Sequence, residues 1–300
     1  MTDFRDPSSY VDRRGYNELF LAASVPLPTF DAGTAADVLE FGTDIVGASS
    51  RWLHYHHFSV AMSRSRKFAH VSAANLDLDT AESVERPSSW HDDSRLDSEQ
   101  QIGEKVGLYG DKPFNFDRGH LTRREDVNWG ANLEEIEAAN LDTHVFTNCT
   151  PQHEDFNQDS WSWRAVEEHI ARQVAAEYRR VTVFTGPVFG SEDPEFAGIA
   201  VPMRYWKIIV VRKSPENVRA AAFDFGQEHL FSRRFAHAEE VDWYERIELS
   251  QVTVREIERR CGLDFGELRN ADVRNRRLVV DEEVRPLPIR GLHDIVVGDS

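Results

Sequence analysis

Residues 114–121 read FNFDRGHL, and this short run is the most informative segment in the middle of the chain. Its apolar residues alternate with polar ones as in a strand. The last part of the run, Asp117 to His120, places a carboxylate, a guanidinium, a glycine and an imidazole at consecutive positions. An imidazole can take a proton near neutral pH, a guanidinium can neutralise a phosphate, and a glycine lets a ligand approach the backbone. Alone, the four residues are better explained as a salt-bridged turn.

A second segment downstream supplies the context that this run lacks. Residues 143–149, THVFTNC, alternate as in a strand, and we expect Pro151 to end that strand. Apolar residues then recur at helical spacing over 163–178, which predicts an amphipathic helix of about five turns. Asn157 precedes this helix, and Glu167 falls in its early turns. The order is therefore a strand with a histidine, a loop, a second strand and a helix.

The rest of the chain adds more strands, another helix and a long polar stretch. Residues 77–101 are polar and predict a long loop, of the kind that often borders a functional site. A helix that begins at Ser250 or Thr253 and ends before Gly262 is indicated near the C-terminus. We therefore expect a mixed α+β fold in which a central sheet is flanked by helices. Strand patterns recur at 52–73, 181–189, 205–211 and 218–225.

The composition bounds the class of protein. The chain has 300 residues, of which 40% are hydrophobic and 11% aromatic, and it can bury a sizeable core without disulfide bonds. We expect one main domain over 41–290, an extension over 1–40 that packs on it, and a tail over 291–300. The polar N-terminus lacks a signal-peptide pattern and only two cysteines are present, so we expect a cytoplasmic protein or one exported by a signal-peptide-independent route. No apolar run approaches the ~18 residues of a membrane span.

The charge balance limits how the chain could bind a polyanion. Its formal net charge of -17 argues against a protein that simply coats nucleic acid. A polyanionic ligand would need a local basic patch or a metal ion. Its affinity would then depend only modestly on salt, through a few phosphate contacts.

Two other clusters of reactive residues are explained without chemistry. In HYHH, residues 54–57, His54 and His56 would share one face of a strand, a spacing compatible with zinc. No second ligand pair accompanies them, so ordinary strand histidines are favoured. Cys149 has His144 nearby, but on one strand these two side chains would point to opposite faces. Because cysteine is among the most often buried residues, a structural thiol is favoured.

Taken together, the segments around residues 117–120 and 157–158 resemble the DNA/RNA non-specific endonuclease family, the ββα-metal nucleases that include mitochondrial endonuclease G. That family shows DRGH, a TN-x-x-PQ segment, an NQ pair, and a Trp and a Glu four residues apart. The matching segments here are DRGH (117–120), TNCTPQ (147–152), NQ (157–158) and the pair Trp163 and Glu167. The likeness covers about residues 10–270 and also runs through YHHFSVAMSRSRKFAHVSAAN (55–75), WHDDSR (90–95), FTGPVF (184–189), VPMRYWK (201–207) and GLDFGEL (262–268).

The resemblance implies a ββα-metal (His-Me finger) fold with a central, mostly antiparallel sheet. It implies a sugar-non-specific endonuclease that hydrolyses DNA and RNA with Mg²⁺, or Mn²⁺ as an alternative, and leaves 5′-phosphate ends. The implied catalytic residues are His120 as the general base, Arg118 to position a phosphate, and Glu167 to orient metal-bound waters. Asn157 is the implied direct metal ligand. On the substrate-binding side the resemblance implies Asn148, which would hold the geometry of the site, and an upstream arginine, for which Arg66 and Arg64 are candidates.

One departure from the family pattern concerns the glutamate. Some members carry it eight residues after the NQ asparagine, where this chain has Ala165. The spacing from Trp163 assigns Glu167 instead, with Glu168 as the alternative.

Competing functions remain at this point. The implied partners are DNA and RNA, with no membrane; a protein inhibitor and a homodimer are further expectations. A catalytically inactive relic that binds nucleic acid or an inhibitor is one alternative, although the presence of His120, Asn157 and Glu167 argues against it. A zinc hydrolase built on His54 and His56 is the other.

Overall fold

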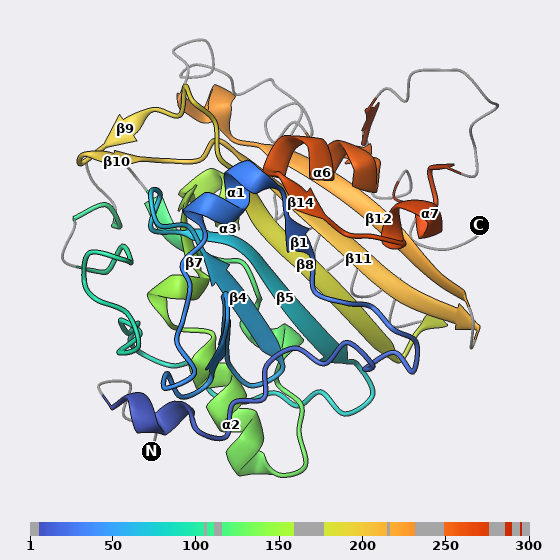
Figure 1. Ribbon diagram of the computed structural model, residues 1–300, viewed down its shortest axis with the longest axis horizontal. Helices are drawn as coiled ribbons and strands as arrows, with labels where there is room; N and C mark the ends of the chain where they lie inside the picture. Colours follow the sequence, from blue (N-terminus) through green and yellow to red (C-terminus); the bar gives the residue numbers. More distant parts are fainter. Residues whose placement is uncertain are drawn as a thin grey trace.

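The computed structural model describes residues 6–104, 107–110, 116–158, 177–214, 217–231, 249–275, 286–289 and 295. Within them the chain forms a mixed α+β fold around one large antiparallel sheet of nine strands (Figure 1). In sheet order the strands are β15 (Leu287–Pro288), β13 (Ser250–Val252), β12 (Asn217–Gly226), β11 (Arg204–Ser214), β8 (Arg180–Val188), β5 (Ala69–Asp77), β4 (Phe58–Met62), β3 (Trp52–His54) and β2 (Ala48–Ser49).

Smaller ribbons and helices surround this sheet. The two-stranded ribbons are β1 (Thr29–Phe30) with β14 (Leu263–Asp264), β9 (Glu195–Phe196) with β10 (Ile199–Ala200), and β6 (Phe116–His120) with β7 (Cys149–His153). The α-helices are α1 (Ala32–Asp37), α2 (Leu133–Asp142), α3 (Glu154–Gln158), α6 (Val254–Cys261) and α7 (Leu268–Ala271). Short 3₁₀ turns are η1 (Pro7–Tyr10), η3 (Arg124–Asp126), η4 (Phe146–Asn148) and η5 (Glu228–Phe231). No helix in the described part of the chain is long and apolar enough to cross a membrane.

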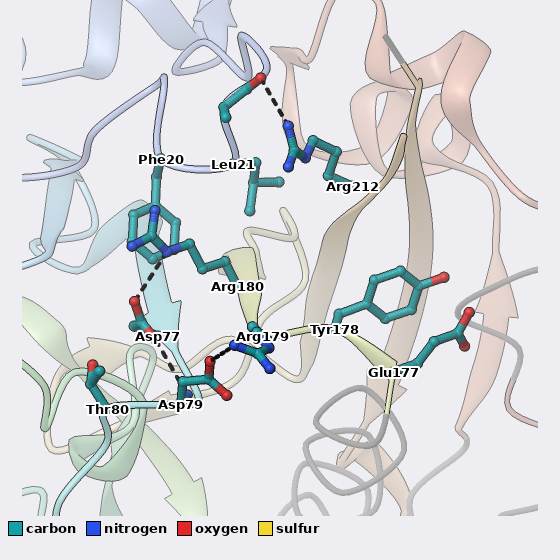
Figure 2. A pocket seen from close by; sticks show the side chains of 11 residues that line it. Phe20, Leu21, Asp77, Asp79, Thr80, Glu177, Tyr178, Arg179, Arg180 and Arg212 are labelled. Atoms are coloured by element: carbon teal, nitrogen blue, oxygen red, sulfur yellow. Dashed lines mark hydrogen bonds and ion pairs between the residues drawn. The ribbon is translucent and has the colours of Figure 1, made fainter. Parts of the chain in front are cut away.

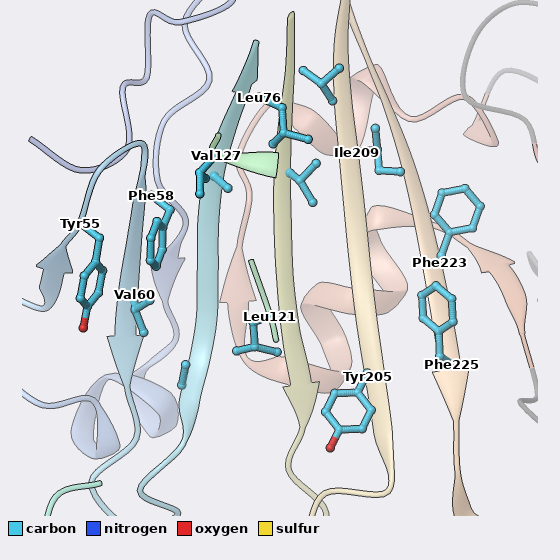
Figure 3. Packing of buried hydrophobic residues seen from close by; sticks show 14 of the residues in the cluster. Tyr55, Phe58, Val60, Leu76, Leu121, Val127, Tyr205, Ile209, Phe223 and Phe225 are labelled. Atoms are coloured by element: carbon cyan, nitrogen blue, oxygen red, sulfur yellow. The ribbon is translucent and has the colours of Figure 1, made fainter. Parts of the chain in front are cut away.

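The central strands read as near-continuous apolar runs because both faces of the sheet are covered. Along β11, Tyr205 and Ile209 belong to the buried cluster on one face, whereas Trp206 and Ile208 belong to the cluster on the other. Figure 3 shows the first cluster, to which β3, β4, β5, β11 and β12 all contribute side chains. The alternation along each strand therefore assigns successive residues to two separate cores.

Different parts of the chain cover the two faces. Helices α6 and α7 lie over the front face in Figure 1 and pack on β12, with Ile257 and Leu268 in the cluster of that face. On the other face, α2, η4 and the β6–β7 ribbon with α3 contribute Ala139, Val145 and Phe156 to the opposite cluster. This arrangement places the segment with DRGH and Asn157 on a rigid, fully packed sheet.

Two contacts dock the β6–β7 ribbon and α3 onto β11. The Tyr205 hydroxyl donates to the Pro151 carbonyl at 2.6 Å, and its ring lies 5.5 Å from that of Phe156. Both aromatic side chains are completely buried. The ribbon and the helix that follows it are therefore held by the same central strand.

The N-terminal segment is fixed by a buried ion pair. Arg13 donates through Nε and Nη2 to the Asp142 carboxylate, which also accepts from the backbone and ring of His56. Asp142 is completely buried, so its charge depends on these donors. The contact joins a residue near the N-terminus to the end of α2.

Several sequence-based predictions are confirmed. Residues 116–120 form a strand, the runs at 181–189, 205–211 and 218–225 lie in β8, β11 and β12, and no regular element interrupts 78–101. The C-terminal helix is α6: Thr253 caps it by accepting from the Glu256 amide, and Gly262 ends it with a φ of 65°.

One prediction about strands is wrong, and another is confirmed only in part. Residues 143–149 were expected to form a strand that Pro151 ends, but 146–148 form the turn η4, and the strand β7 begins only at Cys149 and includes Pro151. Proline is tolerated there because, among the described strands, β7 pairs with β6 alone. Residues 52–73 form three strands, and the turn between the first two contains His57 at a φ of 66°. The expected helix over 163–178 lies outside the described residues, apart from its last two positions.

Candidate active site

The β6–β7 ribbon and α3 carry three of the predicted site residues, namely Arg118, His120 and Asn157. In the antiparallel register His120 faces Cys149, Gly119 faces Thr150 and Asp117 faces Gln152. Helix α3 follows β7 without an intervening loop and packs against both strands. Two strands and a helix thus follow one another here, although the second strand starts later than expected and Asn157 lies within α3 rather than ahead of the helix expected from 163.

Asp117 and Asn157 are joined directly across this unit. The Asn157 side chain donates from Nδ2 to the Asp117 carboxylate at 2.9 Å, which fixes the orientation of the carboxamide. None of the hydrogen bonds among the described residues is donated to Asn157 Oδ1, so that oxygen remains available as a ligand. Asp117 was expected to orient a neighbour rather than to touch a substrate, and this bond is a contact of that kind.

The donor set around Asn157 fits an ion that keeps most of its water. Among the described residues no group of three or more His, Cys, Asp or Glu side chains could hold a metal ion. A closed zinc site, which needs about four protein ligands, therefore has no candidate in that part of the chain. A single amide oxygen beside a carboxylate suits Mg²⁺, which prefers oxygen ligands and commonly retains several waters.

His120, at the end of β6, packs against two other rings, which also contact each other. Its ring centroid lies 4.6 Å from that of Trp90 and 4.9 Å from that of His144. The side chain is partly exposed, whereas its Nε2 is buried and has no hydrogen-bond partner among the described residues.

The surroundings of His120 keep its imidazole neutral. Burial lowers the pKa of His120 well below its ordinary value, and nearby positive charges, on His144 when protonated and on Arg86, Arg123 and Arg124, lower it further. At neutral pH the ring is therefore uncharged and able to accept a proton.

Arg118 points to the same face of β6 as His120, two residues away. Its guanidinium forms an ion pair with Glu104, in which Nε donates to Oε2 at 2.9 Å and Nη2 donates to Oε1. It also lies 5.7 Å from the centroid of the Tyr109 ring. About a third of the side chain is exposed, so it can be reached from solvent.

Asn148 is completely buried, and its side chain bonds backbone groups. Its Oδ1 accepts from the Thr122 amide at 2.9 Å, and its Nδ2 donates to the carbonyls of Thr122 and Thr143. These bonds hold the backbone just after His120 against the turn before β7. The contacts suit holding the geometry of the site, which was one of the two roles expected of Asn148.

Arg66 is held by contacts outside β6, β7 and α3. It lies in the turn after β4, donates to Asp193 and to the carbonyls of Gly190 and Ala200, and lies 4.8 Å from the centroid of the Phe189 ring. None of these contacts involves β6, β7 or α3. Glu167, its alternative Glu168 and Trp163 lie outside the described residues.

The clusters set aside from the sequence have structural partners. His54 bonds Ser49 at 2.7 Å and Ser59 at 2.8 Å, and His56 bonds Asp142 at 2.8 Å. Both ring nitrogens of His54 and Nδ1 of His56 are thus used within the fold. Burial raises the pKa of the Cys149 thiol to about 12, which keeps it protonated and unreactive near neutral pH.

A cavity of about 500 Å³ lies elsewhere, between the N-terminal segment and the ends of β5 and β8 (Figure 2). Arg179 pairs with Asp79 at 2.9 Å and Arg180 pairs with Asp77 at 3.1 Å across it. Its lining includes none of the predicted site residues. The cavity is a salt-bridged surface feature separate from the ββα unit.

Comparison with known proteins agrees with the geometry. The sequence pattern of the family described as DNA/RNA non-specific endonuclease matches residues 35–272. The chain belongs to this family. The fold matches a solved structure of EndoG in complex with EndoGI, with a TM-score of 0.53 at 18% identity over 72% of this chain and 85% of the other. That likeness supports the ββα-metal nuclease fold expected from the sequence.

Two relatives of this endonuclease family differ in how much of their length the chain spans. The y4fB protein of Sinorhizobium fredii is 35% identical over 232 residues, which are 74% of this chain and 34% of that protein. The chain therefore spans about a third of that relative. A nuclease of Serratia marcescens is 26% identical, over 83% of this chain and 88% of its own length.

Three residues of the site were missed from the sequence as functional candidates. Trp90 and His144 contact the ring of His120, and Gln152 lies against Gly119. Trp90 begins the WHDDSR segment and Gln152 belongs to TNCTPQ, so the family resemblance pointed at both without giving them a role. His144 was considered only as a base for Cys149.

Proposed function

We propose that this chain is a metal-dependent endonuclease that hydrolyses phosphodiester bonds in DNA and RNA, with His120 as the general base. The observation that carries the proposal is the ββα unit, which presents a neutral, partly exposed imidazole on β6 and a carboxamide with an available oxygen on α3. Family membership makes a nuclease the expected activity. The catalytic roles of the individual residues and the identity of the metal ion are part of our proposal.

His120 would accept the proton of the attacking water. A base with a strongly lowered pKa is neutral but weak, and the ideal pKa of a general base lies near the working pH. The negative charge of a bound phosphodiester would raise the pKa of His120 to a value nearer neutral pH. The reason is that an opposite charge within a few ångströms favours the protonated form. Substrate binding would thus strengthen the base at the time it is used. General-base catalysis contributes about 10²–10⁴-fold.

Asn157 would hold Mg²⁺ through Oδ1, or Mn²⁺ as the alternative, with Asp117 keeping the carboxamide in place. When bound, the ion would supply Lewis-acid stabilisation of charge on the phosphoryl and leaving oxygens. A neutral ligand leaves most of the charge of the ion available for that purpose. Glu167 would orient metal-bound waters.

Arg118 would bind the phosphate next to the scissile bond, because a guanidinium recognises phosphate oxygens through two parallel hydrogen bonds. Asn148 would keep the end of β6 in place, and Arg66, or Arg64 as the alternative, would be the upstream arginine on the substrate-binding side. The product ends would carry the 5′-phosphate. Since these groups contact backbone and not base edges, cleavage would show little sequence preference and would include both DNA and RNA.

Cleavage assays with defined variants test this proposal. Plasmid DNA and a structured RNA are incubated with the wild-type chain in Mg²⁺, in Mn²⁺, in Zn²⁺ and in EDTA. We expect cleavage of both substrates with Mg²⁺ or Mn²⁺, none in EDTA, and losses of about 10²–10⁴-fold in His120→Ala. His57→Ala, a change at another partly buried histidine, is the matched control and should retain activity.

Three results would contradict the assignment. Cleavage that persists in His120→Ala removes the general base, and cleavage that persists in EDTA removes the metal. An activity that requires zinc favours a different hydrolase. If the wild-type chain binds DNA and cleaves nothing under any of these conditions, the chain is an inactive relic of the fold.

A further inference from the structure

The side-chain amide of Gln227 ties the end of β7 to the central sheet. Gln227 follows β12 directly and is completely buried. Its Oε1 accepts from the backbone amide of His153 at 2.9 Å, and its Nε2 donates to the carbonyls of Pro202 at 2.9 Å and Pro151 at 3.3 Å. The oxygen faces a donor and the nitrogen faces two acceptors, so the partners fix the orientation of the amide.

This amide takes the place of a residue on a neighbouring strand. In a parallel ladder, one residue donates to the carbonyl before its partner and accepts from the amide after it. Gln227 makes the same two bonds with its side chain, to the residues on either side of Gln152. The amide therefore gives β7 a second set of backbone bonds, in addition to its pairing with β6.

Docking of the ribbon alone does not require Gln227. The Tyr205 hydroxyl already donates to the Pro151 carbonyl at 2.6 Å. What Gln227 adds is the bond to His153, the last residue of β7, which is followed at once by the first residue of α3. The additional bond thus holds the point at which the strand becomes the helix.

His153 connects this point to α3. Its Nδ1 accepts from the Asp155 amide, in the first turn of the helix, at 3.2 Å. Asn157 lies two residues further along, and its Nδ2 donates to Asp117 at 2.9 Å. Hydrogen bonds therefore lead from Gln227 through His153 to the helix that carries Asn157. One turn of helix advances about 5.4 Å, so a small change of direction at His153 would displace Oδ1 of Asn157.

We propose that Gln227 is a positioning residue for the metal ligand Asn157: its amide fixes the backbone at His153, from which α3 starts, and so sets the position of Asn157 Oδ1. Gln227 itself touches neither the metal nor the substrate. Loss of its bonds should weaken metal binding and leave His120, on the other strand of the ribbon, with its own contacts. The inference rests on the proposed function, since it concerns the ion that Asn157 would hold.

Three substitutions separate this role from general stability. Gln227→Met keeps an unbranched side chain of similar length and removes all three bonds. Tyr205→Phe removes one of the two donors to the Pro151 carbonyl and leaves Gln227 intact. Gln251→Met is the matched control, because Gln251 is 3% exposed and lies on β13, which pairs with β12 and β15.

Each variant is measured with and without turnover. In the absence of DNA, Mn²⁺ affinity is determined by electron paramagnetic resonance, and Asn157→Ala defines binding at the proposed site. Hydrogen exchange of the His153 amide and the melting temperature are measured on the metal-free chain. With a DNA duplex, the assay gives kcat, KM and the Mg²⁺ concentration for half-maximal cleavage.

We expect Gln227→Met to weaken Mn²⁺ binding about 10–100-fold and to raise the Mg²⁺ concentration for half-maximal cleavage by the same factor. This is the usual cost of losing a group that orients a metal ligand. At saturating Mg²⁺, kcat should stay within about threefold and KM within about twofold of wild type. The His153 amide should exchange about tenfold faster or more, because its acceptor is gone.

The other two variants should lose stability without losing the metal. Tyr205→Phe should change Mn²⁺ affinity less than about threefold, because Gln227 still bonds both Pro151 and His153. Gln251→Met should melt below the wild-type temperature and keep the wild-type affinity for Mn²⁺.

A measurement on the wild-type chain decides the matter if Gln227→Met does not fold. If the bond to His153 favours metal binding, the metal must favour the bond by the same factor. Saturating Mg²⁺ should therefore slow exchange of the His153 amide about tenfold or more. The Asp93 amide, which donates to Gln101 on the long loop at 2.8 Å, is the comparison and should keep its exchange rate.

Three results would overturn the inference. Gln227→Met with wild-type Mn²⁺ affinity shows that the bonds only stabilise the fold. An equal loss of affinity in Gln251→Met shows that general destabilisation is the cause. Exchange at His153 that Mg²⁺ leaves unchanged shows that this bond and the metal site are not coupled.

The metal-binding and exchange measurements need no cleavage. A wild-type chain that binds Mn²⁺ through Asn157, responds to Gln227→Met as expected and cuts neither DNA nor RNA would refute the proposed function alone. The positioning of Asn157 by Gln227 would then still be supported.

Discussion

Replacing Gly119 by alanine should disturb the site without removing any functional group. A Cβ at this position would lie 2.2 Å from Cδ and 2.3 Å from Oε1 of Gln152, where ordinary contacts are 3.4–4 Å. Gln152 is completely buried and cannot swing into solvent. The buried Gln152 side chain or the backbone of β6 must therefore shift, and a shift of β6 displaces the adjacent His120.

The expected magnitude follows from this overlap. Overpacking of a buried site by one methyl group typically costs about 1–3 kcal/mol, which for a chain of this size lowers the melting temperature by roughly 2–10 °C. A displacement of about 1 Å at the catalytic group can reduce the rate about 10²-fold. Activity should thus fall much further than stability does.

A second substitution should relieve the clash. Neither Nε2 nor Oε1 of Gln152 has a hydrogen-bond partner among the described residues, so Gln152→Ala alone should change stability little. In Gly119→Ala/Gln152→Ala the new methyl group has space, and the double-mutant cycle should show a favourable coupling of about 1–3 kcal/mol. Thermal unfolding and plasmid cleavage of the four proteins measure both effects.

The control is a glycine with room around it. At Gly33, in α1, a Cβ would meet a single neighbouring atom within 4 Å, at 3.6 Å, so Gly33→Ala should be neutral or stabilise by about 0.4–1 kcal/mol. Wild-type melting and cleavage of Gly119→Ala would refute the reasoning. So would a double variant that is as impaired as the single one.

Further predictions concern the neighbours of the site and acid stability. Asp117→Asn weakens the acceptor of the Asn157 amide, so the Mg²⁺ concentration for half-maximal cleavage should rise about 10–100-fold; an unchanged Mg²⁺ titration would contradict this. Glu104→Gln frees the guanidinium of Arg118 from an exposed ion pair worth about 0–1 kcal/mol, so KM should fall up to about fivefold at constant kcat, and a higher KM would count against it. Burial lowers the pKa of His54 to about 4, so stability should fall as the pH is lowered from about 6.5, where the unfolded residue takes up a proton, to about 4. In His54→Phe, the number of protons taken up on unfolding, measured from the pH dependence of the free energy of unfolding in chemical denaturation, should fall by up to one. An unchanged slope of that free energy against pH would show that His54 does not cause the dependence.

The fold was predictable where a segment carries a strong pattern of its own. Strands β8 and β11 are long apolar runs, and α6 has both a cap and a terminal glycine. The DRGH strand was predictable for the same reason. In each case the local preference and the tertiary environment favour the same structure.

The segment 143–153 shows where such reasoning fails. Its residues alternate like a strand from Thr143, yet the Asn148 amide binds the backbone of Thr122, just after His120, and the carbonyl of Thr143, and residues 146–148 form the turn η4. This tertiary contact outweighs the local pattern. Pro151 was expected to end the strand, but it occupies an edge position that a sequence alone does not reveal.

Contacts between distant segments were also beyond the sequence. Trp90 and His144 meet His120 from a long loop and from the turn before β7, and Glu104 reaches Arg118 from the same long loop. No periodicity encodes which loop residue comes to rest on a strand. The DRGH motif therefore indicated His120 as the candidate base, but it did not indicate the residues that pack against it.

The electrostatics of the site explain how so acidic a chain could bind a polyanion. Arg118 and the arginines that lower the pKa of His120, namely Arg86, Arg123 and Arg124, place positive charge at the base, against a net charge of -17 overall. If each of them neutralised one phosphate, log Kd would change with log salt by about 3 to 4, since each contact on duplex DNA contributes about 0.9. A protein that coats DNA reaches about 10. Attraction confined to the site, with repulsion elsewhere, would favour brief contacts at the point of cleavage and rapid release of the cut strand.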